Sequence, residues 1–129
     1  MKIAILIARI LLGLMFLVFG LNDILHFLPM PAMPPSDATT FATILVSSHY
    51  MDFVGILMII SGVLLLVGRY VPLALVLLGP ILVNILLYHF FIMHGGAAMG
   101  LIATLLELFL IWAYRLSFRG LFDAAPEVS

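Results

Sequence analysis

Cysteine is absent from the sequence and charged side chains are scarce. Without Cys, disulfides, CxxC redox motifs, thiolate nucleophiles and cysteine-bound iron–sulfur clusters are excluded. Only 9% of the residues are charged, whereas soluble domains average about 25%. A net charge of −1 without any basic run gives no sign of nucleic-acid binding. No nucleophile–base pair, phosphate-binding loop or metal-ligand motif occurs, so we expect that the chain is not an enzyme on its own.

Apolar residues take the place of the missing charges. They make up 66% of the chain, whereas soluble domains average about 45–50%. A soluble fold of 129 residues cannot bury so much apolar surface. The composition therefore predicts a single integral membrane domain over residues 1–129, with the lipid bilayer as its solvent.

Four apolar runs are separated by turn-forming residues. A helix needs roughly 20 apolar residues to cross a bilayer core. The second run is short by this measure and could begin a few residues earlier. We expect an all-α fold, a four-helix up-down bundle with helices at about 3–28, 53–67, 71–93 and 97–112 and an outer loop at 29–52.

The basic residues all fall on one side of these predicted helices. They occupy the N-terminal part, the connection between the second and third runs, and the C-terminal part, whereas the other connections contain none. By the positive-inside rule, both termini are expected on the cytoplasmic side of a bacterial inner membrane. These residues are Lys2, Arg9, Arg69, Arg115 and Arg119.

The expected outer loop begins with a cluster of prolines, which favour extended chain over helix. After this cluster, Ser36 or Asp37 is suited to cap a short helix through Thr43 to Val46. Such a helix would be moderately apolar and would lie on the outer membrane surface. The prolines of the cluster are Pro29, Pro31, Pro34 and Pro35.

Glycines recur at seven-residue spacing in the first two predicted helices. Gly13 and Gly20 share one face of the first helix, and Gly55 and Gly62 share one face of the second. Small residues let helix backbones approach closely in a membrane, where no hydrophobic force drives association. We interpret both pairs as packing surfaces.

Polar side chains gather at the end of the first apolar run. Asn22 and His26 are four residues apart and Asp23 and His26 are three apart, so each pair shares a helix face. One interpretation is a helix end that meets headgroups and water. The other is one wall of an outward-facing polar pocket.

The third run carries a second polar group. Asn84 lies near the middle of the membrane, Tyr88 follows one turn later on the same face, and His89 lies on an adjoining face. Pro80 frees a backbone carbonyl and is expected to kink the helix beside Asn84. The alternatives are an interhelical hydrogen bond, worth about 0.6 kcal/mol on average, and a second wall of the pocket.

Glu107, in the fourth run, is the costliest residue of the chain. A carboxylate near the centre of a bilayer costs about 2.5–3.5 kcal/mol on insertion scales. It can be neutral, form a structural ion pair with Arg9, or bond to Asn84; a proton-carrying or ligand-binding role is the alternative. The candidate pocket or ligand-binding residues are therefore Asn22, Asp23, His26, Asn84, Tyr88, His89 and Glu107.

Histidine placement bears on metals and haem. A transmembrane haem needs two facing histidines, for which His26 and His89 are the only suitable pair, and no HxxxH or HExxH spacing occurs. We therefore expect neither a haem nor a bound metal, and no catalytic residues.

Three stretches, ARILLGLMFLVFGLNDILHFLPMP, GVLLLVGRYVPLALVLLGPILVNILLYHFF and LELFLIWAYR, resemble the DoxX family of small bacterial membrane proteins. The resemblance runs from about Arg9 to Arg115 and includes an Arg-x-x-x-Gly opening, a Gly-Leu-Asn helix end and a Gly-Arg-Tyr-x-Pro turn. It implies a four-helix membrane bundle. Family members often have lysine where this chain has Asp23, an acidic residue at Met58 and asparagine at Glu107.

The family takes its name from a subunit linked to a thiosulfate:quinone oxidoreductase. The resemblance thus implies a non-catalytic accessory or anchor subunit of a quinone-linked membrane oxidoreductase system, with a quinone as the cofactor to test and other membrane or redox subunits as partners. One alternative is a small-molecule or lipid-binding protein or transporter, which would usually work as a homodimer. The other is a structural scaffold for partner helices.

Overall fold

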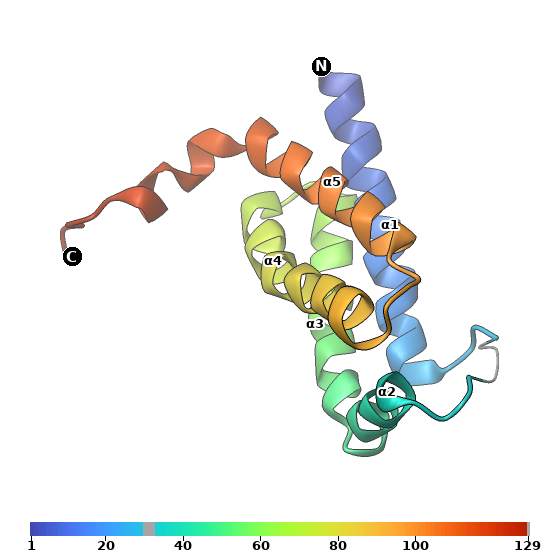
Figure 1. Cartoon of the computed structure of the whole chain (residues 1–129). Coiled ribbons are helices and arrows are strands. Elements are labelled where there is room, and N and C mark those ends of the chain that lie inside the picture. The colour runs from blue at the N-terminus through green and yellow to red at the C-terminus, as the bar shows by residue number, and fades with distance from the viewer. Residues whose placement is uncertain (30–32, 129) are drawn as a thin grey trace.

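The computed structural model describes residues 1–29 and 33–128 and contains helices but no strands in these ranges (Figure 1). Pro31 of the proline cluster lies outside them. The elements are α1 (Lys2–Leu25), α2 (Asp37–Ser47), α3 (Tyr50–Val67), α4 (Val71–Leu87), the π-helix η1 (Tyr88–Ile92), α5 (Ala98–Ala113) and the 3-10 helix η2 (Arg115–Phe122).

Three helical segments are long and apolar enough to cross a membrane: α1, α3, and α4 together with η1. At about 1.5 Å per residue, the 16 residues of α5 fall short of a bilayer core of about 30 Å. η2 follows α5 after a bend of 82°, and the two count as a fourth span only if they are taken together. The described chain thus has three candidate spans, or up to four.

The first helix ends three residues before the expected boundary at 28. Its C-cap is His26, which has left-handed backbone angles (φ 53°). The side-chain oxygen of Asn22 accepts a hydrogen bond from the Leu28 amide at 2.8 Å. This bond satisfies an amide beyond the helix and turns the chain away from the helix axis, although the sequence remains apolar there.

The connection from α1 to α3 contains the expected short helix, with wider bounds. Ser36 is its N-cap and accepts a hydrogen bond from the Thr39 amide at 3.2 Å. The helix α2 then runs through the predicted segment to Ser47. α3 begins at Tyr50, three residues before the expected start at 53.

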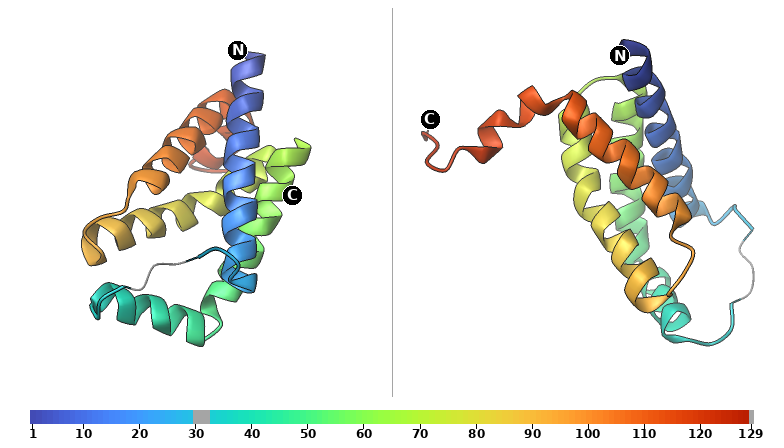
Figure 2. Two further views of the ribbon diagram at one scale, coloured as in Figure 1. Left: turned by 90° about the vertical axis from the view of Figure 1, so that its right-hand side faces the viewer. Right: turned by 45° about the horizontal axis from the view of Figure 1, so that its top comes forward.

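The glycine pairs of α1 and α3 face each other, as their spacing predicts. A Cβ built on Gly20 would lie 2.8 Å from the Gly55 carbonyl oxygen, and one on Gly62 would lie 2.8 Å from that of Gly13. Gly13 therefore pairs with Gly62 and Gly20 with Gly55, so the two helices run antiparallel. Figures 1 and 2 show α1 and α3 side by side along most of their length.

α4 continues through Pro80 and then widens into η1. Together they end at Ile92, one residue before the expected boundary. Two residues of the turn before α5 have positive φ, His94 at 56° and Gly96 at 72°. The hairpin of α4 and α5 leans away from α1 and α3 toward this turn (Figure 2).

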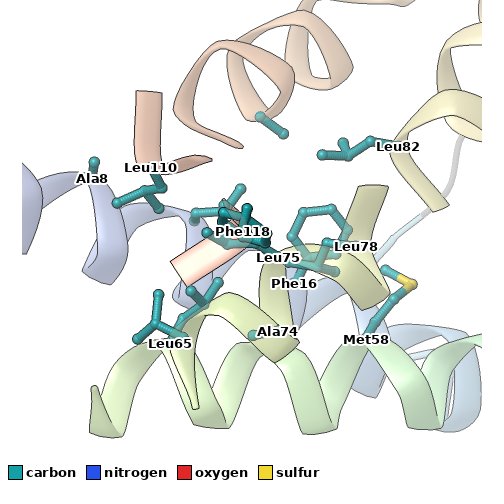
Figure 3. Packing of buried hydrophobic residues seen from close by; sticks show 13 residues of the cluster. Ala8, Phe16, Met58, Leu65, Ala74, Leu75, Leu78, Leu82, Leu110 and Phe118 are labelled. Carbon is teal, nitrogen blue, oxygen red and sulfur yellow. The ribbon is translucent and has the colours of Figure 1, made fainter. Parts of the chain in front are cut away.

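The core lies where the helices converge, and most of its members are aliphatic. α1, α3, α4 and α5 each contribute to one cluster, and η2 adds Phe118, which is 8% exposed. Phe118 thus ties the bent C-terminal segment to the helices before it. Figure 3 labels ten members of the cluster: Ala8, Phe16, Met58, Leu65, Ala74, Leu75, Leu78, Leu82, Leu110 and Phe118.

Candidate functional site

Asn22 and His26 are positioned by the end of α1. Asn22 uses its side-chain oxygen to accept the Leu28 amide hydrogen, as described above. His26 has an exposed side chain on a left-handed residue. Both residues therefore take part in ending the helix.

Asp23 points to α3 instead. A Cβ on Gly55 would lie 3.0 Å from the Asp23 Cβ, so the side chain starts at the close contact of the two helices. Its Oδ2 atom is buried and has no hydrogen-bond partner among the described residues. Asp23 is thus a half-buried carboxyl, and no donor in the described chain bonds to its Oδ2 atom.

Tyr88 and His89 connect η1 to its surroundings. The Tyr88 hydroxyl donates a hydrogen bond to the Ala38 carbonyl of α2 at 3.3 Å. Its ring stacks on Phe41 at 5.8 Å between centroids. His89 Nδ1 lies 3.0 Å from the Gly95 carbonyl oxygen in the following turn. These polar groups attach α2 and close the turn.

Asn84 does not reach Glu107. Its side chain is exposed, and its Nδ2 donates to the Pro80 carbonyl one turn earlier in the same helix at 2.9 Å. Because Pro80 and Asn84 both belong to α4, the side-chain amide of Asn84 bonds within its own helix. The hydrogen bond between helices that the sequence suggested is absent from the described chain.

Glu107 is 3% exposed, and both carboxyl oxygens are buried without a hydrogen-bond partner in the described ranges. Oε2 faces α4, where a Cβ on Gly79 would lie 3.6 Å away. Arg9 does not form the suggested ion pair, because its guanidinium lies against Gly68, 2.9 Å from where a Cβ would be. Within the described chain the only ion pair joins His49 and Asp52, at 2.9 Å.

The seven candidate residues lie on different elements, and none of them lines either of the two cavities described below. They divide into the end of α1, the α1–α3 contact, the attachment of α2, the exposed face of α4 and the buried face of α5. In residues 1–29 and 33–128, no three side chains of the metal-ligating types come together. His26 and His89 belong to different parts of this arrangement, and His89 already has the Gly95 carbonyl as a partner.

Two open cavities exist elsewhere. The first, about 300 Å³, lies between α2 and the segment before it and includes Met33, Thr40 and Ile44. The second, about 390 Å³, lies between the start of α1 and the end of α5 and includes Lys2, Arg9 and Tyr114. The sequence analysis missed the second cavity, although the seven-residue spacing of Lys2 and Arg9 places both on one helix face.

Comparison with known proteins gives a partial match. No family model matches the chain, and no solved structure does. The chain is similar to the uncharacterized protein YwoB of Bacillus subtilis (strain 168), with 36% identity over 80 residues. That region is 61% of this chain and 52% of YwoB, so the chain spans about half the length of the curated relative.

Proposed function

We propose that the chain is a DoxX-like, multi-pass protein of the bacterial cytoplasmic membrane with both termini inside. The observation that supports this topology is the charge distribution on the fold. The basic residues lie at the start of α1, in the α3–α4 turn and in η2, and Figure 1 draws these three segments at the same end of the helices. In this topology α5 crosses a locally thinned bilayer as the fourth span, and η2 continues it along the interface.

The topology has a direct test, because the chain has no native cysteine. Ser47→Cys and Ser117→Cys each place one thiol at an exposed position, at opposite ends of the helices. In intact cells, a membrane-impermeant maleimide should label Ser47→Cys, and should label Ser117→Cys only after permeabilisation. Labelling of Ser117→Cys in intact cells would contradict the proposed orientation.

Within that membrane, the chain acts as a non-catalytic accessory or anchor subunit of a quinone-linked oxidoreductase system. The supporting observation is that Asn22, Asn84 and Tyr88 bond to the chain's own backbone. Their role is thus to shape the helices, whose wide apolar outer faces remain for lipid and partner helices. The link to quinones comes from the sequence resemblance.

Membranes from a strain that lacks the protein test this role. Quinone reduction by the affected dehydrogenase should fall and should return when the wild-type chain is supplied, while the purified chain alone should show no turnover. Unchanged quinone reduction with every electron donor tested would refute the role. Complementation by Asn84→Leu should be complete, because that exposed amide bonds only to its own helix.

Glu107 favours a second candidate, a small-molecule or proton-linked binding protein. Its carboxyl is buried with neither a cation nor a donor near it in the described chain. Such groups in membrane helices commonly serve ion or proton pathways. Glu107→Gln keeps the shape and removes the acid, so it should abolish complementation if the carboxyl acts chemically. It should leave complementation intact if the accessory role is correct.

A further inference from the structure

The cavity at the basic end of the helices has a mixed lining. α1 contributes Lys2, Ile5, Leu6 and Arg9, and the end of α5 contributes Ala113 and the adjacent Tyr114. Its volume of about 390 Å³ falls within the usual range for ligand sites, about 300–1,000 Å³. The lining therefore combines two cationic side chains with an aliphatic wall.

The four α1 residues form one stripe on that helix. Positions i, i+3, i+4 and i+7 lie on the same helix face, so Lys2 and Arg9 bracket Ile5 and Leu6. At about 1.5 Å per residue, the two charges are about 10 Å apart along the axis. Lysine and arginine side chains are long enough for both to reach one phosphate placed between them, beside the apolar surface of Ile5 and Leu6.

Arg9 lacks a counter-charge. Its Nε atom is buried and has no acceptor among the described residues. The only ion pair in residues 1–29 and 33–128 is that of His49 and Asp52, which belong to the segment around the start of α3. An arginine placed in this way needs an external acceptor, and a phosphate matches its planar fork of donors.

The residues next to the cavity indicate the level of the membrane at which it lies. The Arg115 guanidinium lies 4.8 Å from the centre of the Trp112 ring. η2, which turns by 82° from α5, exposes Leu116 and Leu121 beside its arginines. Tryptophan and amphipathic segments of this kind occupy the level of the lipid headgroups. Ala113 and Tyr114 of the lining stand between Trp112 and η2 in the chain, so the cavity belongs to that level.

We propose that this cavity binds an anionic phospholipid, with the headgroup phosphate on Lys2 and Arg9 and an acyl chain along Ile5 and Leu6. A basic pocket between helices on the cytoplasmic side is suited to anionic headgroups. The inference requires that the helices enter a membrane. It does not depend on the accessory role, so either can fail without the other.

The test uses the full chain in nanodiscs that contain equal parts of phosphatidylglycerol and phosphatidylcholine. After gentle detergent release, native mass spectrometry measures which lipid stays bound. We expect the wild-type chain to retain phosphatidylglycerol selectively. Each of Arg9→Gln and Lys2→Gln should reduce that selectivity by about tenfold or more, which is the conversion of about 1.5 kcal/mol for a hydrogen bond to a charged group.

Arg69→Gln and Arg119→Gln are the matched controls, since each removes one positive charge at the same end of the helices but outside the cavity lining. Both should retain wild-type selectivity. An equal loss in all four variants would overturn the proposal, because general surface charge would then explain the preference. A wild-type chain without preference for phosphatidylglycerol would also overturn it.

Two further measurements test whether a variant has simply misfolded and whether the bound ligand is a lipid or free phosphate. Arg9→Lys keeps the charge but loses the planar fork, so its selectivity should lie between those of Arg9→Gln and the wild-type chain. Full wild-type selectivity in Arg9→Lys would contradict a phosphate held by the guanidinium fork. Inorganic phosphate should not displace the lipid, since it has no acyl chain to contact Ile5 and Leu6. Displacement by phosphate at millimolar concentration would refute the lipid assignment.

Discussion

The two antiparallel helix pairs of this fold are held together in different ways. In the α1–α3 pair, backbone meets backbone at Gly13–Gly62 and Gly20–Gly55. In the α4–α5 pair, side chains fill the space: a Cβ on Gly100 would meet Ile85 and Leu86 side-chain atoms, at 3.2 and 3.3 Å, and one on Gly79 would meet only the Glu107 carboxyl.

From this difference we infer that α1 and α3 form a rigid frame, whereas the hairpin of α4 and α5 can adjust. Close backbone approach leaves no room for change, because any added atom must displace main chain. The α4–α5 pair contains a proline, a π-helical end and an unpartnered carboxyl. Such features are typical of segments that carry function and that tolerate repacking. Matched changes in the two pairs should therefore have unequal effects.

Alanine at glycine positions should give the largest contrast. In Gly20→Ala the new Cβ would lie 2.8 Å from the Gly55 carbonyl oxygen, so the helices must separate. We expect a loss of about 1–3 kcal/mol in the free energy of unfolding. In Gly79→Ala the nearest atom would be 3.6 Å away, and the better helix propensity of alanine should offset any cost.

Thermal unfolding in one detergent, followed by size-exclusion chromatography of heated samples, measures both variants. Gly95→Ala is the control for a glycine with no neighbour within 4 Å of the added atom. If Gly20→Ala and Gly79→Ala lost equal stability, the α1–α3 contact would not be the rigid part of the fold.

The glycine contact is the part of the fold that the sequence predicts best, for a simple reason. A seven-residue spacing repeated in two helices leaves few other uses for four glycines. The cap at Ser36 is similarly predictable, because it depends only on residues within the next turn. Both features are local or periodic, and neither requires knowledge of how distant segments meet.

The candidate site is predicted less well, because polar side chains choose between nearby and distant partners. Asn84 could bond across to α5 or back to its own helix, and the sequence is the same in both cases. Arg9 could pair with Glu107 or lie against Gly68, and the sequence is compatible with both. The 82° bend between α5 and η2 also depends on tertiary packing, through Phe118.

Glu107→Leu should stabilise the α4–α5 pair. Each buried polar group without a partner costs about 1–3 kcal/mol, and both Glu107 oxygens are of this kind within the described chain. We expect a gain of about 1–3 kcal/mol in the free energy of unfolding and more efficient insertion of α5 in a translocon assay. A loss of stability would instead mean that an outside group, such as water or a partner, bonds to the carboxyl.

Single hydrogen bonds on the two sides should have smaller effects. Asn22→Ala removes the acceptor of the Leu28 amide, and Tyr88→Phe removes the donor to the Ala38 carbonyl. Each should cost about 0.5–1.5 kcal/mol. Asn22→Ala should speed hydrogen exchange at the Leu28 amide alone, because α1 is held by its glycines.

Tyr88→Phe should instead speed exchange over the whole of α2, since of the two contacts described above only the stacking on Phe41 would remain. Asn84→Ala is the control, as its amide bonds only within α4. If exchange after Tyr88→Phe stayed at wild-type rates throughout α2, the hydroxyl would not hold that helix to the hairpin.

The smallest effects concern two histidines with left-handed backbone angles, His26 at φ 53° and His94 at φ 56°. A left-handed backbone costs a residue with a Cβ about 1–2 kcal/mol. Glycine avoids that cost, but the greater freedom of the unfolded chain lowers the free energy of unfolding by about 0.5–1 kcal/mol. His26→Gly should therefore gain about 0.5–1 kcal/mol, visible as a higher midpoint of thermal unfolding.

His94→Gly should gain nothing measurable, although its backbone angle is nearly the same. It would create a run of three glycines with Gly95 and Gly96. The added freedom of the unfolded chain at this run should offset the relief of the left-handed backbone strain. The end of α1, by contrast, stays fixed by the Asn22 hydrogen bond. A loss of stability in His26→Gly would show that the exposed imidazole itself anchors α1 at the membrane surface.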